Sequence, residues 1–177
     1  RIREICAQSA RQAGLLKNPE LSDVRRSVVV TRAAEEAKKE FGGAGHLGSL
    51  SASALAETLH TLVETLSPFG DDAGQIHEWL VARKPAAGKL RQLGLLYGHY
   101  RRLCGDARIA DTRDINAAIL QLLNGDRSRW PHLLQTLEGS LIFRSIRWLN
   151  PFEEKLVAAL KAGLGDARVK IGSALPH

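Results

Sequence analysis

The spacing of apolar residues along the chain predicts helices for most of its length. Leu55, Leu59, Leu62 and Leu66 recur at intervals of three or four residues, which places them on one face of a helix. Between residues 72 and 137 the pattern predicts helices only. Outside that stretch, the same periodicity predicts a helix over residues 2–16.

Four short segments have the pattern of strands instead: residues 27–30, 46–50, 140–146 and 168–175. The first contains Val28, Val29 and Val30, a β-branched run that is typical of a buried parallel strand. Thr31 follows at once and is suited to cap a helix over residues 32–41. A strand followed directly by a capped helix predicts the first half of a βα unit.

The last two predicted strands flank a helix whose first residue is predicted by several sequence signals. Asn150 is a good cap, Pro151 suits the first helical position, and Glu153 completes a capping box. A strand, a helix and a strand with short links predict a parallel crossover. We therefore expect a helix-rich α/β fold, a parallel sheet into which an all-helical subdomain is inserted. Residues 1–70 and 138–177 would form the α/β core, and residues 71–137 the helical insert.

Composition places the chain among ordinary globular proteins, with 44% hydrophobic and 25% charged residues in a length of 177. No apolar run approaches the roughly 20 residues that cross a bilayer, so no membrane partner is expected. Cys6 and Cys104 match no metal or redox spacing. A disulfide between them stays open, but buried thiols are favoured, which indicates a reducing compartment and a cytoplasmic location.

The chain begins at Arg1 and contains no methionine, which we interpret as the sign of a fragment. Its net charge of +6 permits an anionic partner such as nucleic acid. The basic residues are spread along the chain, so a solvated basic surface accounts for the charge equally well.

No intact catalytic motif is present in the sequence. There is no phosphate-binding loop, and the glycine cluster at residues 42–45 follows a helix, so its amides are not aimed along a helix start at a phosphate. His60 lies near Glu57 and Glu64 on one predicted helix face. An exposed ion pair is the preferred interpretation there, because a third metal ligand is not evident. We expect no catalytic residue, no metal and no cofactor.

Three stretches in this order resemble the first motor domain of superfamily I helicases of the UvrD/Rep type, and most closely the helicase-like subunit of AddAB-type helicase–nucleases. Residues 28–36 are similar to a strand-to-helix motif that touches single-stranded DNA in that family. Residues 96–102 resemble a Tyr-rich helix of its helical subdomain, and residues 141–153 resemble the Walker B strand and the helix after it. The resemblance implies the parallel sheet of a P-loop-helicase-like domain.

The chain departs from that family where the chemistry lies. Active relatives end the Walker B strand in carboxylates that hold Mg²⁺, whereas Arg144, Arg147 and Trp148 occupy the corresponding region here. The phosphate loop would lie before Arg1. The resemblance therefore implies an inactivated module that hydrolyses no ATP by itself, within a parent protein that could be an ATP-dependent helicase or nuclease.

Two functions follow as hypotheses. The first is single-stranded DNA binding in DNA repair or recombination, with Thr31 and Arg32 on a phosphate and Arg144, Arg147 and Trp148 adding basic and stacking contacts. Core packing is the alternative role for Trp148. The second is a helical protein–protein interaction module with no nucleic-acid role. Its partner would be the remainder of its own polypeptide or a helicase–nuclease partner subunit.

Overall fold

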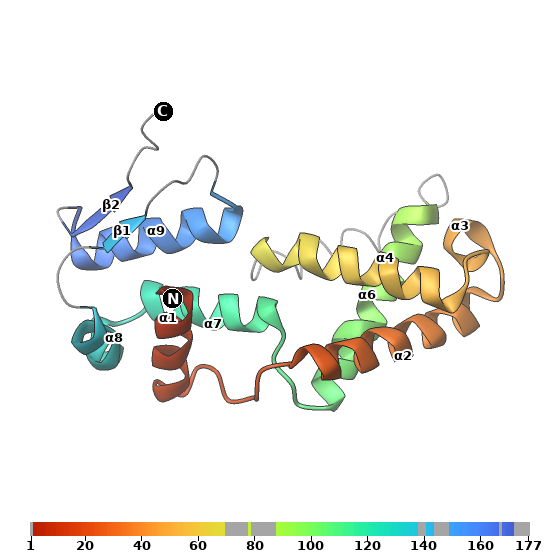
Figure 1. Ribbon diagram of the computed structural model, residues 1–177, viewed down its shortest axis with the longest axis horizontal. Helices are drawn as coiled ribbons and strands as arrows, with labels where there is room; N and C mark the ends of the chain where they lie inside the picture. Colours follow the sequence, from red (N-terminus) through yellow and green to blue (C-terminus); the bar gives the residue numbers. More distant parts are fainter. Residues whose placement is uncertain are drawn as a thin grey trace. The chain divides into compact units, whose positions relative to one another are not determined.

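The structure, a computed structural model, describes residues 2–69, 78, 88–137, 141–143, 149–166 and 168–171. Most of these residues lie in helices (Figure 1). The contacts divide the chain into two compact units, one made of Arg1–Lys17 and Asp114–His177, the other of Asn18–Arg113. None of the described helices combines the length and the apolar character that crossing a membrane requires.

The expected α/β fold is wrong. The run Val28–Val30 lies inside the long helix α2 (Asp23–Phe41), and residues 45–48 form the short helix α3 (Gly45–Gly48). Within the described residues, the only sheet consists of two three-residue strands. Helices therefore stand where the parallel sheet of a P-loop-helicase-like domain was expected, and the chain is predominantly helical.

The reason lies in a helix cap upstream of the valines. The extended backbone of Ser22 places its Oγ to accept a hydrogen bond from the Arg25 amide at 3.4 Å, so α2 begins at Asp23. A β-branched residue costs a helix only about 0.7 kcal/mol relative to alanine. Burial of one face of α2 offsets that cost. The buried residues of this face are Val30, Ala33, Ala34, Ala37 and Phe41. Thr31 consequently lies in the middle of the helix and caps nothing.

Three helices make up the core of the Asn18–Arg113 unit. Helix α2 packs against α4 (Ala52–Leu66) and α6 (Gly88–Asp106), and these two also contact each other (Figure 1). Gly42 ends α2 in the left-handed conformation, φ 56°, as the sequence predicted. Ser51 caps the start of α4, and its side chain accepts from the Ala54 amide at 3.2 Å. The bounds of the two units differ from the division expected at residues 70 and 138, because α6 joins α2 and α4.

The two segments that enter and leave this unit are hydrogen-bonded together. Ala110 donates its amide to Pro19 O at 2.9 Å and accepts from the Leu21 amide at 2.8 Å. The following residue, Asp111, is buried and forms an ion pair with Arg101 at 2.8 Å. Burial, and then the charge of Asp111, raise the pKa of the nearby Tyr100 phenol far above its usual value. The junction is therefore a tightly packed polar part of the core.

The other unit contains α1 (Ile2–Gln12), α7 (Thr112–Asn124), η3 (Arg127–Arg129) and α8 (Pro131–Thr136), followed by α9 (Pro151–Leu164). Trp130 is buried in it and donates its Nε1 hydrogen to Leu122 O at 2.9 Å. Burial also raises the pKa of the Cys6 thiol to about 12. Cys6 and Cys104 are both buried and are not joined in a disulfide, which confirms the expectation of buried thiols.

The C-terminal strand–helix–strand prediction is confirmed on a small scale. Asn150 Oδ1 accepts from the Glu153 amide at 3.0 Å, and the Glu153 carboxylate accepts from the Asn150 amide at 2.9 Å, so the capping box is complete. Strands β1 (Leu141–Phe143) and β2 (Val169–Ile171) pair in parallel. Leu141 lies opposite Val169 in this register.

Glycine-to-alanine substitutions distinguish packing from helix propensity. A Cβ on Gly163 of α9 would lie 1.9 Å from Trp130 Cη2, whereas a Cβ on Gly105 of α6 meets nothing within 4 Å. We predict that Gly163→Ala lowers the free energy of unfolding by about 1–3 kcal/mol through overpacking. Gly105→Ala should raise it by about 0.5 kcal/mol. Urea unfolding followed by circular dichroism measures both, and equal effects would contradict the Trp130 contact.

Candidate functional site

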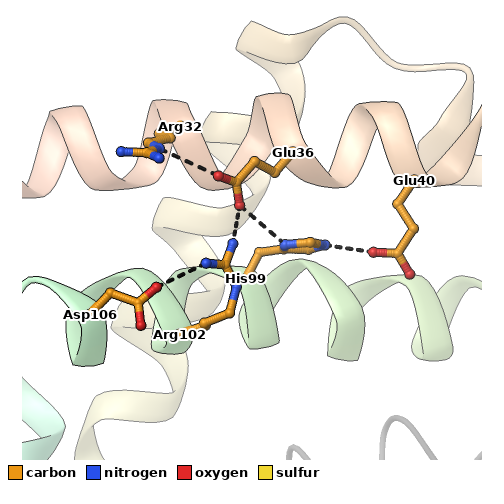
Figure 2. A network of polar contacts seen from close by, with 6 residues as sticks. All are labelled: Arg32, Glu36, Glu40, His99, Arg102 and Asp106. Carbon is orange, nitrogen blue, oxygen red and sulfur yellow. Dashed lines mark hydrogen bonds and ion pairs between the residues drawn. The ribbon is translucent and has the colours of Figure 1, made fainter.

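A polar network joins α2 to α6 and is built around Glu36 (Figure 2). One carboxylate oxygen of Glu36 contacts both the Arg102 guanidinium and His99 Nδ1, the latter at 3.4 Å. The other oxygen lies 3.4 Å from Nε of Arg32, which is on the preceding turn of α2. Glu36 therefore binds two side chains of α6 and one of its own helix.

Two further contacts extend this network along α6. His99 Nε2 lies 2.7 Å from a carboxylate oxygen of Glu40, and Arg102 bonds to Asp106 at 2.9 Å. Residues later in α6 thus contact residues earlier in α2, so the two helices run antiparallel. The network fixes the position of the end of α6 beside the middle of α2.

An apolar groove opens next to this network on the N-terminal half of α2. We call it the valine groove, and its volume is about 290 Å³. It is lined by Val24, Arg25, Val28, Val29, Arg32, Leu103, Ala107 and Ile109. Val24 is 77% exposed and Val28 is 63% exposed, and they are the two most exposed large hydrophobic side chains of the described residues. Adjacent valines this accessible form a continuous apolar surface rather than isolated exposed positions.

The groove exists because the two antiparallel helices end at different levels. Arg102 contacts Glu36 one turn before α6 ends at Asp106, whereas α2 extends about three and a half turns on the N-terminal side of Glu36. The first turns of α2 therefore project past the end of α6. On the side of the groove, Leu103 at the end of α6 and Ala107 and Ile109 in the segment after it lie beside them.

The groove is lined mainly by apolar side chains and also by positively charged ones. Arg25 and Arg32 line it, and none of the described residues that line it is acidic. The side chain of Arg32 is 68% exposed, although its Nε contacts Glu36. Both guanidinium groups are thus accessible beside the valines, and the groove favours a ligand with apolar and anionic groups.

The opposite side of α2 has a different character. A cleft of about 530 Å³ lies between α2 and α4, and its lining residues include charged and polar ones such as Arg26, Thr31, Glu57 and His60. His60 Nε2 lies 3.2 Å from a carboxylate oxygen of Glu64, which confirms the expected ion pair. Among the residues that the structure describes, no group of three His, Cys, Asp or Glu side chains could hold a metal.

The residues predicted to bind nucleic acid are placed only in part. Thr31 and Arg32 are both exposed, but Thr31 lines the cleft beside α4 while Arg32 lines the valine groove. Neither lies at the start of a helix, so the helix-terminus argument for a phosphate does not apply. Arg144, Arg147 and Trp148 lie outside the described residues. Nucleic-acid contact by these five residues stays a prediction.

No family model, curated protein or solved structure matches the chain. The resemblance to a helicase motor domain therefore stays a prediction, while the sheet that it implied is wrong. The sequence interpretation also missed Val24 and Val28. Their position could be read from the sequence once Ser22 is taken as the cap of a helix that begins at Asp23, because Val28 then falls on the side of the helix away from the buried alanines.

Neighbouring glutamates on α2 provide a matched test of the network. Glu36 contacts Arg32, His99 and Arg102, whereas the preceding residue, Glu35, is exposed to solvent. We predict that Glu36→Ala lowers the free energy of unfolding by about 1 kcal/mol, because these contacts are partly exposed to solvent. Glu35→Ala should change it by less than about 0.5 kcal/mol. Urea denaturation of both variants measures this, and equal losses would show that the network contributes nothing.

Proposed function

We propose that this chain is a helical protein-interaction module without catalytic activity, which binds a segment of a partner protein in the valine groove. The observation that carries the proposal is the exposure of Val24 and Val28, at 77% and 63%, beside further apolar groups of α2 and the end of α6. Covering apolar surface of this kind is the main source of favourable free energy in protein association. The two free thiols agree with a reducing compartment such as the cytoplasm.

The size of the groove favours a peptide over a small molecule. Its volume of about 290 Å³ lies just under the roughly 300–1,000 Å³ of sites that enclose drug-sized ligands. A space this small and open accepts one or two apolar side chains from a larger partner. The partner segment belongs to another part of its own polypeptide or to another subunit.

A peptide selection tests this function without knowledge of the partner. We predict that a displayed library of random peptides, selected on the full chain, yields peptides that bind in the groove. The affinity of the double variant Val24→Ser/Val28→Ser for these peptides should be lower on the order of tenfold, because the variant loses apolar contact area. Leu134→Ser is the matched control, since Leu134 is 44% exposed on α8, outside the groove. No enrichment, or equal binding to the double variant, contradicts the proposal.

Single-stranded DNA binding is a second candidate function, favoured by the uneven distribution of charge. Thirteen of the 25 basic residues and twelve of the 19 acidic residues lie in Asn18–Arg113, so that unit carries a net charge of +1. The other unit therefore carries +5 of the total of +6. Arg144, Arg147 and Trp148 belong to that basic unit, and basic surface is what attracts a phosphate backbone.

The salt dependence of binding tests the second function. Fluorescence anisotropy with a labelled single-stranded oligonucleotide should show binding that weakens as salt increases, by a slope of about 0.7 per phosphate contact on a double logarithmic plot. Replacing Arg144 and Arg147 by Ala should lower that slope by about 1.4 if each contacts one phosphate. Absence of binding at low salt, or binding without a salt slope, rules this function out.

A further inference from the structure

We infer that the occupant of the valine groove is an amphipathic helix of another polypeptide segment, with acidic residues seven positions apart and two apolar residues between them, at the third and fourth positions after the first acid. This inference rests on the proposed peptide-binding function and adds the chemistry and conformation of the ligand. Three observations support it: most of the residues that line the groove belong to helices, its two arginines have a defined spacing, and the sequence of this chain lacks the matching pattern.

The walls of the groove favour a helix over an extended strand. Val28 and Arg32 lie inside α2, where backbone amides and carbonyls are bonded within the helix, and Val24 lies in its first turn. An extended peptide laid along this part of α2 would find few backbone partners, and its own groups facing the groove would lose their hydrogen bonds to water. A helix satisfies its own backbone and can insert apolar side chains three and four positions apart into an apolar groove.

The arginines define the spacing of the acidic residues. Arg25 and Arg32 are seven positions apart on α2, which corresponds to about 10 Å along the helix axis. Two acidic residues seven positions apart on a helix are separated by the same distance and point the same way. Apolar residues at the third and fourth positions after the first acid lie on that face too, at the level of Val28 and Val29, which are three and four positions after Arg25. A nucleic-acid strand could pair with the two arginines, but it would set its charged backbone against the valines.

The chain does not supply this pattern itself. Acidic residues seven positions apart occur three times in its sequence: Glu57 with Glu64, Glu64 with Asp71, and Asp71 with Glu78. The two positions that should be apolar are His60–Thr61, Ser67–Pro68 and Gly74–Gln75, respectively. A second copy of this chain is therefore a poor occupant, and the segment comes from outside residues 1–177.

The test uses a synthetic helical peptide of Ala and Gln that carries Glu at positions 1 and 8 and Leu at positions 4 and 5 of the motif. Its fluorescein-labelled form is titrated with the full chain and followed by anisotropy. One control peptide has Lys in place of both Glu residues, and another has the Leu residues moved to the opposite helix face. We expect the Glu peptide to bind on the order of tenfold more tightly than either control.

Charge reversal in the protein provides the matched controls. Arg25→Glu and Arg32→Glu should each weaken the Glu peptide about two- to fivefold. Lys39→Glu makes the same charge change at an exposed position of α2 outside the groove and should leave binding unchanged. The double variant Arg25→Glu/Arg32→Glu should in turn bind the Lys peptide more tightly than the wild type does. Circular dichroism verifies that each variant is folded.

The outcomes separate this inference from the function on which it rests. If selected library peptides bind the groove but the Glu peptide binds no better than the Lys peptide, the inference is overturned and the peptide-binding function stands. If neither kind of peptide binds, both fail. A dimer in sedimentation that Val24→Ser/Val28→Ser abolishes would make a second copy the occupant, and an oligonucleotide that displaces the Glu peptide would make it a nucleic acid. Either result overturns the inference.

Discussion

The close approach of helices at the alanine face of α2 is the constraint on which the Asn18–Arg113 unit depends. Ala33, Ala34 and Ala37 are fully buried, and their small side chains let α4 and α6 pack directly against the same helix. Larger residues at these positions would separate the three helices, and residues such as Leu55, Leu59 and Leu96 would then lose contact area.

That constraint also determines where the surface of α2 remains uncovered. The alanines occupy the part of α2 that α6 reaches, and the Glu36 network keeps the end of α6 at this level. Toward its N-terminus, α2 continues beyond α6 and presents Val24 and Val28 to solvent. The valine groove is thus a consequence of unequal helix lengths in an otherwise well-packed unit. Surface charge alone would not have revealed it, because the unit is nearly neutral.

The sequence predicted the elements whose ends carry strong local signals. The capping box of Asn150 and Glu153 lies where the pattern placed it, and α2 ends just before the glycine cluster that was expected to follow a helix. The strand predicted at residues 27–30 was wrong because a β-branched run has only a weak local preference, and the Ser22 cap together with burial of one helix face outweighed it. Much of the resemblance to a helicase depended on that strand. The groove escaped prediction for the same reason, since Val28 and Val29 were assigned to a buried strand.

The separation of charge and apolar surface has a consequence for how the two candidate functions relate. The groove lies in a unit of net charge +1, so its binding should depend mainly on contact area and only modestly on salt, through Arg25 and Arg32. Nucleic-acid binding would draw on the unit of net charge +5 and would depend strongly on salt. The two candidate functions would therefore rely mainly on different physical interactions, although Arg32 belongs both to the groove and to the predicted nucleic-acid contacts. This arrangement requires that substitution of the groove valines leaves DNA affinity intact. It also requires that substitution of basic residues in the unit of net charge +5 leaves peptide affinity intact.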